Sequence, residues 1–381
     1  MLKNCNLLKN RFDIELAKKL AKIGAEKGIM LSGMTRDQTA ASFSGQSLRP
    51  ADAILIASDL QFMAVLTTMY LNNNSIGGDG AKAIVEALKV NPVLTNLQLD
   101  NNDIGDDGAK AIAEALKVNP VLTELSLWDN NIGDEGATAI AEALKVNPVL
   151  TNLNLGSNDM GDDGAKAIAE ALKVNAVLTN LELGNNGIGY DGAKAIAEAL
   201  KVNPVLTSLD LQTNSIGVDG AKAIAEALKV NPVLTGLDLY RNSIGVEGGK
   251  AIAEALKVNP VLTILYLGGG NHIGPEGAKA IADSLKSGMA VLTKLDLQRN
   301  SIGDDGAKAI AEALKVNPVL TNLDLDYNSI GDEGAKAIAE ALKVNAVLTK
   351  LNLKYNSTMG DAGKQAVRDA VKDRSGFELE L

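Results

Sequence analysis

A 28-residue pattern that repeats along most of the chain constrains the fold more than any other feature of the sequence. The string KAIAEALKVN occurs seven times in the 381 residues, beginning at Lys110, Lys166, Lys194, Lys222, Lys250, Lys308 and Lys336. One full unit runs from Leu94 to Val121. Units of this length bury their apolar face only against neighbouring units, so we expect a stacked array and not a closed globule.

Each unit has a strand half and a helix half. Leu97 and Leu99 alternate with polar residues in TNLQL, which predicts a short strand with one buried face. Asn102 follows the strand and is expected to satisfy backbone groups of the bending loop. The segment AKAIAEALKV separates apolar from charged residues at helical spacing, and Asp106 or Asp107 is expected to begin this helix. Helices pack further apart than strands, which predicts a curved array with the helices outside.

The repeats leave no room for a linker, so we predict a single domain over residues 1–381 with about 13 units. Residues 1–68 form degenerate units with an insertion near 32–39, residues 69–350 form regular repeats, and residues 351–381 form the last unit and a cap. The first unit begins without an evident cap, which leaves open whether the chain is part of a longer protein. The near-identical helices also leave open a consensus design, against which the degenerate units and insertions argue.

The apolar positions of one unit are Leu94, Leu97, Leu99 and Ile104, and together with Asn102 they follow the spacing L-x-x-L-x-L-x-x-N-x-I. This pattern resembles the leucine-rich repeat family, and the unit length and helical second half are similar to its ribonuclease-inhibitor-like type. The resemblance implies an α/β horseshoe solenoid with a parallel sheet on the concave side and helices on the convex side.

Composition excludes several classes of function. A net charge of −10 and a pI of about 4.9 argue against nucleic acid and anionic membranes as partners. With one histidine, His272, and one cysteine, Cys5, we expect no metal site, no cofactor and no Ser/His or Cys/His catalytic pair. Cys5 replaces a strand leucine and is expected to be buried. The sequence shows neither a signal peptide nor a transmembrane stretch, which favours a cytoplasmic protein and leaves its oligomeric state open.

The candidate site lies where the repeats differ. The helices are almost constant, whereas the residues between and after the two strand leucines vary from unit to unit. Six of the seven large polar-tipped aromatics are expected at these outward strand positions: Tyr70, Trp128, Tyr240, Tyr266, Tyr327 and Tyr355. Exposed tyrosine and tryptophan are enriched at binding hot spots, which predicts a partner-binding concave face. The alternative is that the rings only cover the sheet.

Charged residues occupy the same face. The predicted partner-binding set includes the acids between the two leucines and two arginines: Glu182, Asp210, Asp238, Asp296, Asp324, Arg241 and Arg299. Like charges on neighbouring strands are destabilising, so one interpretation is that the acids bind a basic segment. The alternative is that they are common filler in such repeats, or that Arg241, Lys294, Arg299, Lys350 and Lys354 neutralise them.

We therefore predict a non-catalytic scaffold that binds a protein or peptide on its concave strands. Two other hypotheses follow from the resemblance. Similar repeats build the GTPase-activating protein of the Ran GTPase, although that family usually ends in a long acidic tail, which this sequence lacks. They also form the ligand-sensing array of innate-immune type receptors. Neither the partner nor its pathway can be derived from the repeat pattern.

Overall fold

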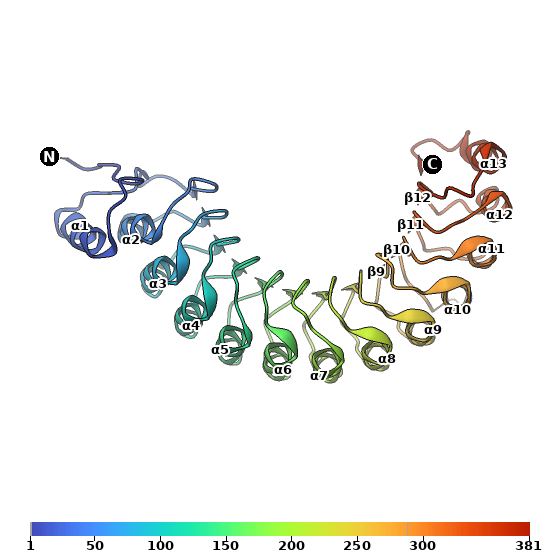
Figure 1. Cartoon of the computed structure of the whole chain (residues 1–381), viewed down its shortest axis with the longest axis horizontal. Helices are drawn as coiled ribbons and strands as arrows, with labels where there is room; N and C mark the ends of the chain where they lie inside the picture. Colours follow the sequence, from blue (N-terminus) through green and yellow to red (C-terminus); the bar gives the residue numbers. More distant parts are fainter. Residues whose placement is uncertain (1, 288) are drawn as a thin grey trace. The chain divides into compact units, whose positions relative to one another are not determined.

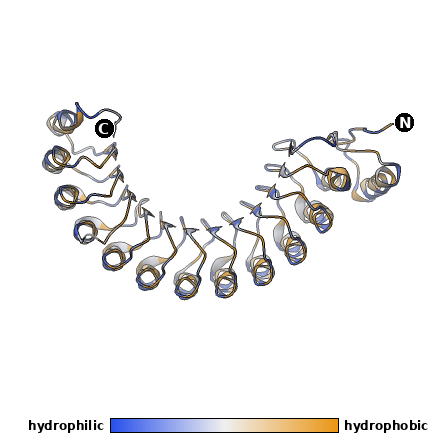
Figure 2. Ribbon diagram, turned by 180° about the vertical axis from the view of Figure 1, so that it is seen from behind, coloured by the Kyte–Doolittle hydropathy of each residue, from blue (hydrophilic) through white to orange (hydrophobic). Residues whose placement is uncertain are grey.

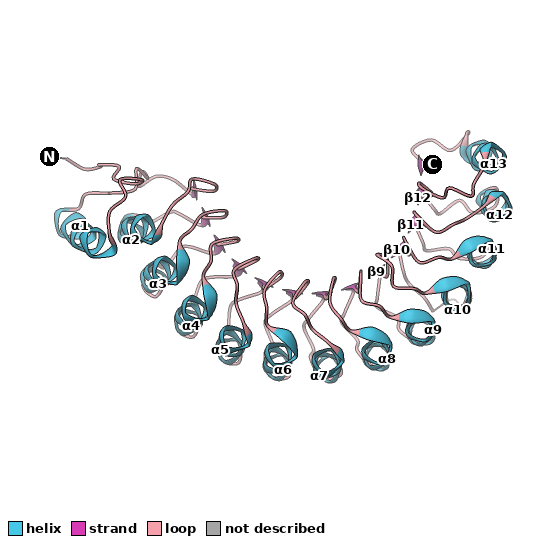
Figure 3. Ribbon diagram, viewed as in Figure 1, coloured by secondary structure: helices cyan, strands magenta, loops and turns pink. Residues whose placement is uncertain are grey.

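The computed structural model describes residues 2–287 and 289–381, and it divides into two compact units, Met1–Asn186 and Gly187–Leu381. In both units, helices and short strands alternate along the chain (Figure 3). The single domain expected from the sequence stays a prediction.

The first unit contains six helices and six strands among its described residues. The helices are α1 (Ile14–Lys27), α2 (Pro50–Asp59), α3 (Gly77–Leu88), α4 (Gly105–Leu116), α5 (Asp134–Leu144) and α6 (Gly161–Leu172), with a 3₁₀ turn at Leu60–Phe62. The strands are β1 (Ala40–Ser42), β2 (Thr68–Tyr70), β3 (Asn96–Gln98), β4 (Glu124–Ser126), β5 (Asn152–Asn154) and β6 (Asn180–Glu182). Each strand pairs in parallel with the next, from β1 to β6.

The second unit contains seven helices and seven strands, counted over its described part. The helices are α7 (Tyr190–Leu200), α8 (Gly217–Leu228), α9 (Gly245–Leu256), α10 (Gly274–Lys286), α11 (Gly303–Leu314), α12 (Asp332–Leu342) and α13 (Asp361–Val371). The strands are β7 (Ser208–Asp210), β8 (Gly236–Asp238), β9 (Ile264–Tyr266), β10 (Lys294–Asp296), β11 (Asn322–Asp324), β12 (Lys350–Asn352) and β13 (Glu378–Glu380). They also pair in parallel and in sequence order, from β7 to β13.

Within each unit the strands lie on the inner side of the curve and the helices on the outer side (Figure 1). The core fills the space between them, and the apolar colouring of Figure 2 follows the segments that connect strands to helices. Leu97 and Leu99 are fully buried, and the side chains of Ile112 and Leu116 are only 1% and 2% exposed. Ala113 beside them is also buried, so a small side chain separates neighbouring helices. The strand and helix halves expected from the sequence are confirmed.

Buried asparagines satisfy the bending loop, as the pattern predicted, and each also joins its repeat to the preceding one, which was not predicted. The Nδ2 amide of Asn102 donates to the carbonyls of Leu71 and Leu99, both at 2.9 Å, and so links its own repeat to the preceding one. A second asparagine in each regular repeat ends the helix: Nδ2 of Asn119 donates to the Leu88 carbonyl at 2.7 Å. Buried backbone groups that would otherwise lack a partner are satisfied in this way throughout both units.

The acids at the helix starts act differently from the prediction. No side-chain cap is found on α4 itself. Instead, the Asp106 carboxylate accepts hydrogen bonds from the backbone N–H groups of Gly133 and Gly136, at 2.8 and 2.9 Å, at the start of the next helix, α5. Asp304 and Asp332 cap α12 and α13 in the same way. The parallel stacking of helices brings one first turn beside the N-terminus of the next, and a carboxylate there stabilises the free N–H groups.

Backbone pairing and a buried acid hold the N-terminal segment of the first unit in place. Cys5 donates its N–H to the Met30 carbonyl at 2.8 Å. The fully buried Asp59 carboxylate accepts hydrogen bonds from Leu31 and Ser32. The expectation of a buried Cys5 is wrong: its side chain is half-buried, because it lies in the outermost paired segment of this unit, where a single neighbouring segment covers it.

Candidate functional site on the strand faces

The aromatic residues of the first unit lie on or directly after its strands. Tyr70, at the end of β2, is 41% exposed, and Trp128, which follows Leu127, is 42% exposed. The indole lies against the next repeat, because a Cβ atom built on Gly156 would be 3.0 Å from Cδ1 of Trp128. Gly156 occupies the position equivalent to Trp128 one repeat later, and its missing side chain leaves the space that the ring fills.

The polar groups on this face of the first unit are hydrogen-bonded across repeats. The Asp100 carboxylate accepts from Nδ2 of Asn72 at 2.6 Å, from the Ser126 hydroxyl and from the backbone N–H of Trp128 at 3.1 Å. Nε2 of Gln98 donates to Glu124 at 3.2 Å. Glu182 is exposed at the end of β6. Asp100 and Glu124 therefore accept hydrogen bonds from donors in neighbouring repeats.

The second unit carries a row of four aspartates, Asp210, Asp238, Asp296 and Asp324, here called the acid row. Asp210 is the register partner of Asp238, and Asp296 that of Asp324. Tyr266 separates the two pairs, since it is paired with Asp238 on one side and Asp296 on the other. The structure thus brings these predicted residues together on neighbouring strands.

Each carboxylate of the acid row accepts a hydrogen bond from its own repeat, and Asp324 also accepts one from Nδ2 of Asn352 in the next repeat, at 3.0 Å. Asp210 accepts from the Gln212 N–H at 2.7 Å, and Asp296 accepts from the Gln298 N–H at 2.8 Å. Asp238 accepts from the Tyr240 N–H at 2.8 Å. Within residues 2–287 and 289–381 no ion pair forms on any of the four. Two lysines considered as counter-ions pair elsewhere: Lys350 with Glu378, and Lys354 with Glu380.

Burial and mutual repulsion raise the pKa values of carboxylates in the acid row. Burial raises the pKa of Asp238 to about 7, repulsion from Asp210 and Asp296 acts in the same direction, and the Tyr240 N–H and Lys294 oppose it. Burial likewise raises the pKa of Asp210 and of Asp296. A low-dielectric environment disfavours the charged form of a carboxylate, which is the dominant cause in all three.

A cation from within the chain lies at the gap in the row. The Lys294 ammonium is 4.7 Å from the ring centre of Tyr266, a cation–π distance, and it acts electrostatically on both Asp238 and Asp296. The half-buried Tyr240 leans over the irregular loop, since a Cβ atom on Gly269 would lie 2.8 Å from Cε1 of its ring. Large rings in both units thus face glycines of the following repeat, a pairing that is visible in the sequence but was not predicted from it.

Six predicted residues do not lie on the strands. Trp128 and Tyr240 come two residues after β4 and β8 end. Arg241, Arg299, Tyr327 and Tyr355 occupy the turn that follows each strand, with left-handed φ values of 56°, 55°, 51° and 53°. The expectation that Trp128, Tyr240, Tyr327 and Tyr355 are strand residues is wrong. Each strand holds only three residues. The chain then turns at the residue that directly precedes the buried asparagine, and Tyr327 and Tyr355 occupy this position. These side chains therefore form the edge of the strand face.

Three of the turn residues stack on one another across successive repeats. The rings of Tyr327 and Tyr355 have centroids 4.5 Å apart and planes inclined by 21°. The Arg299 guanidinium lies 4.4 Å from the Tyr327 ring centre, on the repeat before. Arg299, Tyr327 and Tyr355 are here called the turn stack. The sequence predicts all three residues as part of the site but not their contact, because the alternation pattern assigns them to the strand.

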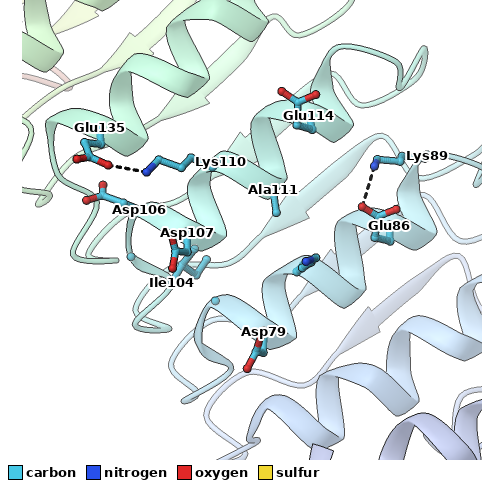
Figure 4. Close-up of a pocket in the computed structure, with 13 residues that line it drawn as sticks. Asp79, Glu86, Lys89, Ile104, Asp106, Asp107, Lys110, Ala111, Glu114 and Glu135 are labelled. Carbon is cyan, nitrogen blue, oxygen red and sulfur yellow. Dashed lines mark hydrogen bonds and ion pairs between the residues drawn. The ribbon is translucent and has the colours of Figure 1, made fainter. Parts of the chain in front are cut away.

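A hollow on the outer side of the first unit has a different character. It lies between α3 and α4 and is lined by charged helix residues (Figure 4). Lys89 pairs with Glu86 at 2.7 Å and Lys110 with Glu135 at 2.5 Å. These residue types recur in most helices of the array, so the hollow reflects the scaffold and the glycine at position 78, where other repeats have a larger residue.

The described part of the chain offers neither a metal cluster nor a membrane-spanning helix. No group of three or more His, Cys, Asp or Glu side chains is arranged to hold a metal ion there. Over the same residues, no helix combines the length and apolarity that crossing a membrane requires. His272 lies exposed in the irregular loop before α10.

The alternation of parallel strands and helices, with one constant and one variable side, defines a repeat solenoid with an open strand face. The profile of the Leucine Rich repeat family matches eleven segments: residues 63–85, 90–113, 118–141, 146–169, 174–197, 202–225, 230–253, 258–282, 289–311, 316–339 and 344–367. These segments cover more than half of the chain, which therefore belongs to the leucine-rich repeat family. Its ribonuclease-inhibitor-like type stays a prediction.

Solved structures share the fold at low sequence identity. A chain in the crystal structure of the yeast Rad7 and Elc1 complex has a TM-score of 0.58 and 15% identity, over 97% of this chain and 88% of that one. An internalin (inlF) from Listeria monocytogenes has a TM-score of 0.53 and 20% identity, over 97% and 94%. Leiomodin-1 Actin-Binding Site 2 is 33% identical over 33% of this chain and 75% of that one, with a TM-score of 0.32. The curated proteins contain no match to the chain.

Proposed function

We propose that the chain is a non-catalytic scaffold that binds a protein or peptide on its strand faces, and that the second unit contacts a basic segment of the partner. The observation that carries this proposal is the acid row: register-paired carboxylates without an ion-pair partner among the described residues. Curved repeat arrays generally use their concave surface for binding, which supports the choice of face.

A bound cation stabilises the acid row more than it stabilises an isolated carboxylate on the surface. Two like charges on directly paired strand positions repel each other, and burial increases that repulsion. A Lys or Arg side chain above Asp238 and Asp296 relieves both penalties at once. The Lys294 ammonium over Tyr266 acts on both of these carboxylates, and an incoming basic side chain would take up the same surroundings.

Selection from a random peptide library on the immobilised full chain tests the proposal. We expect enriched peptides to be rich in Lys and Arg, and to lose binding to the double variant Asp238→Asn, Asp296→Asn. The matched control is Asp107→Asn, Asp305→Asn, which removes the same charge from exposed first-turn positions of α4 and α11. Enrichment of peptides without basic residues, or equal retention by the two double variants, would contradict the proposal.

A further inference from the structure

The strand pairing of the first unit is interrupted before β1. The N–H groups of Cys5 and Leu7 donate to the carbonyls of Met30 and Leu31, both at 2.8 Å, and not to β1. Among the described residues, no backbone hydrogen bond joins residues 3–9 to β1. Residues 32–39, which have no counterpart in the regular 28-residue repeat, follow Leu31 and precede β1. The insertion therefore replaces the strand pairing between the first two repeats.

A hollow of about 330 Å³ lies at this interruption. The insertion supplies four of its lining residues: Ser32, Gly33, Met34 and Gln38. Met34, Ala41 and Phe43 give it a buried apolar surface. Its volume falls in the range that binds small organic molecules, and the combination of apolar surface with a few polar groups is typical of such sites. The insertion thus builds a cavity that the repeat pattern does not require.

The amides that line the hollow present hydrogen-bond donors. Oδ1 of Asn6 accepts the N–H of Leu8 at 3.0 Å, and Oε1 of Gln38 accepts the N–H of Thr35 at 2.9 Å. Because each amide is oriented through its oxygen, its nitrogen keeps two N–H groups that no described residue accepts. Nδ2 of Asn6 lies over Gly33, where a Cβ atom would come within 2.8 Å of it.

The charge of the hollow is positive, although the chain as a whole carries −10. Lys9 is the only charged residue in the lining, and the described part of the chain supplies no ion pair to its ammonium. Two acids contact the same segments but are bound to backbone donors. Asp52 accepts the N–H of Lys9 at 2.7 Å, and Asp59 accepts that of Leu31 at 2.8 Å.

One ammonium and two amide donors favour an anion in the hollow. A carboxylate has two oxygens and about four acceptor positions, enough to accept from all three groups. The buried surface of Met34 and Phe43 has no polar group to offer, so it favours an apolar body behind the charged end.

We propose that the hollow beside the insertion binds an organic carboxylate with an apolar body. The carboxylate accepts from Lys9, Asn6 and Gln38, and the body packs on Met34 and Phe43. The site lies in the first unit and does not depend on the acid row of the second, so it goes beyond the proposed function. A free organic acid and the C-terminal residue of a partner protein both offer this chemistry.

Titration of the full chain with two acids, followed by ligand-observed NMR, tests the site. The probes are 4-methylpentanoate and N-acetyl-leucine, each compared with its uncharged amide. We expect each acid to bind about tenfold more tightly than its amide, because the amide loses the charge-assisted hydrogen bonds. Acetate, which lacks the apolar body, should bind at least about tenfold more weakly than 4-methylpentanoate. Tighter binding of N-acetyl-leucine supports a C-terminal residue as the ligand, and tighter binding of 4-methylpentanoate supports a free acid.

Two variants assign the preference for the acid to the named donors. Lys9→Met removes the exposed ammonium, and Gln38→Glu keeps the oxygen that accepts from Thr35 but replaces the amide donor with a negative oxygen. Each should abolish the difference between acid and amide. The matched control is Lys22→Met, which removes the same charge from an exposed position of α1 and should preserve the difference. Circular dichroism checks that all three variants fold.

The outcomes separate this site from the acid row. Equal binding of acid and amide, equal behaviour of Lys9→Met and Lys22→Met, or no binding of any acid would overturn the carboxylate site and leave the basic-segment proposal standing. Binding of the acids that survives in the double variant Asp238→Asn, Asp296→Asn supports a separate site. It would stand even if the peptide selection yielded no basic peptides.

Discussion

The two units carry the same scaffold under two different strand faces. Leu97 in the first unit and Leu237 in the second are equally buried, at 0% and 1% exposure. Above them, Asp100 of the first unit receives three donors from neighbouring repeats, whereas Asp238 of the second is in register with another aspartate, Asp210. A difference confined to the outward positions cannot serve the core. Asp100 is therefore stabilised by donors of its own chain, whereas Asp238 is destabilised by burial and by Asp210, which supports the proposal that a partner's cation stabilises the second face.

The largest expected effect tests whether the scaffold is the same in both units. Asn102→Ala and Asn328→Ala each remove a fully buried amide that links two repeats. Each should lower the free energy of unfolding by about 3 kcal/mol, because buried backbone carbonyls lose their donors. Urea unfolding followed by circular dichroism measures both. A cost in one unit several times that in the other would show that the scaffolds are not equivalent.

The second prediction separates the two faces by pH. Burial raises the folded-state pKa of Asp238 from 3.8 to about 7. Its favourable contribution is therefore fully present below pH 3.8 and is lost as the pH rises through about 7. Asp238→Asn should be more stable than the unmodified chain by on the order of 2 kcal/mol at about pH 8, with the difference disappearing near about pH 4.

The first unit supplies the contrast for this measurement. Asp100→Asn removes a carboxylate that holds three donors, so it should destabilise the chain at about pH 8, by about 1 kcal/mol. Thermal unfolding of both variants at several pH values provides the comparison. Opposite signs at alkaline pH support the distinction between a carboxylate with several donors and one that burial and repulsion destabilise, and a destabilising Asp238→Asn would remove it.

A third prediction uses the only tryptophan as a reporter of the first face. Gly156→Ala places a Cβ atom 3.0 Å from Cδ1 of Trp128, tighter than most such contacts, and should displace the ring toward solvent. We expect a red shift of tryptophan emission and a loss of about 1 kcal/mol in stability. Gly236→Ala is the control, because its nearest contact is 3.6 Å. An unchanged emission maximum would contradict the packing of Trp128 on Gly156.

Much of the scaffold was predictable because the same solution recurs in every repeat. The spacing of Leu97, Leu99 and Asn102 specifies a buried strand, its end and the amide that bridges two repeats. The capping by Asp106 was not predictable in detail, since its recipient is a neighbouring helix start and not its own. Periodicity within one repeat carries no information on contacts between neighbouring repeats.

The placement of the candidate site residues was predictable in part, and their role in binding stays a prediction. Variation among repeats correctly grouped Asp210 with Asp238, because equivalent positions of parallel strands must be register partners. It misplaced Trp128, Tyr240, Tyr327 and Tyr355, because the strand is only three residues long and the turn begins sooner than alternation suggests. The stacking of their rings depends on side-chain directions in a left-handed turn, which no pattern of apolar residues specifies.

The smallest expected effect concerns these turns, where exchanging residues between the units isolates the backbone cost. Asn101→Tyr gives the first unit a tyrosine at a φ of 52°, without a neighbouring ring, and should destabilise the chain by about 1 kcal/mol. Tyr355→Asn relieves the same strain but loses the contact with Tyr327, so the two terms should nearly cancel, within about 0.5 kcal/mol. Urea unfolding at neutral pH measures both variants.

A large loss of stability in Tyr355→Asn would mean that the turn stack stabilises the fold, and its tyrosines would then need no partner to explain them. A neutral result leaves the strained tyrosines without a role in folding, and so strengthens their assignment to binding.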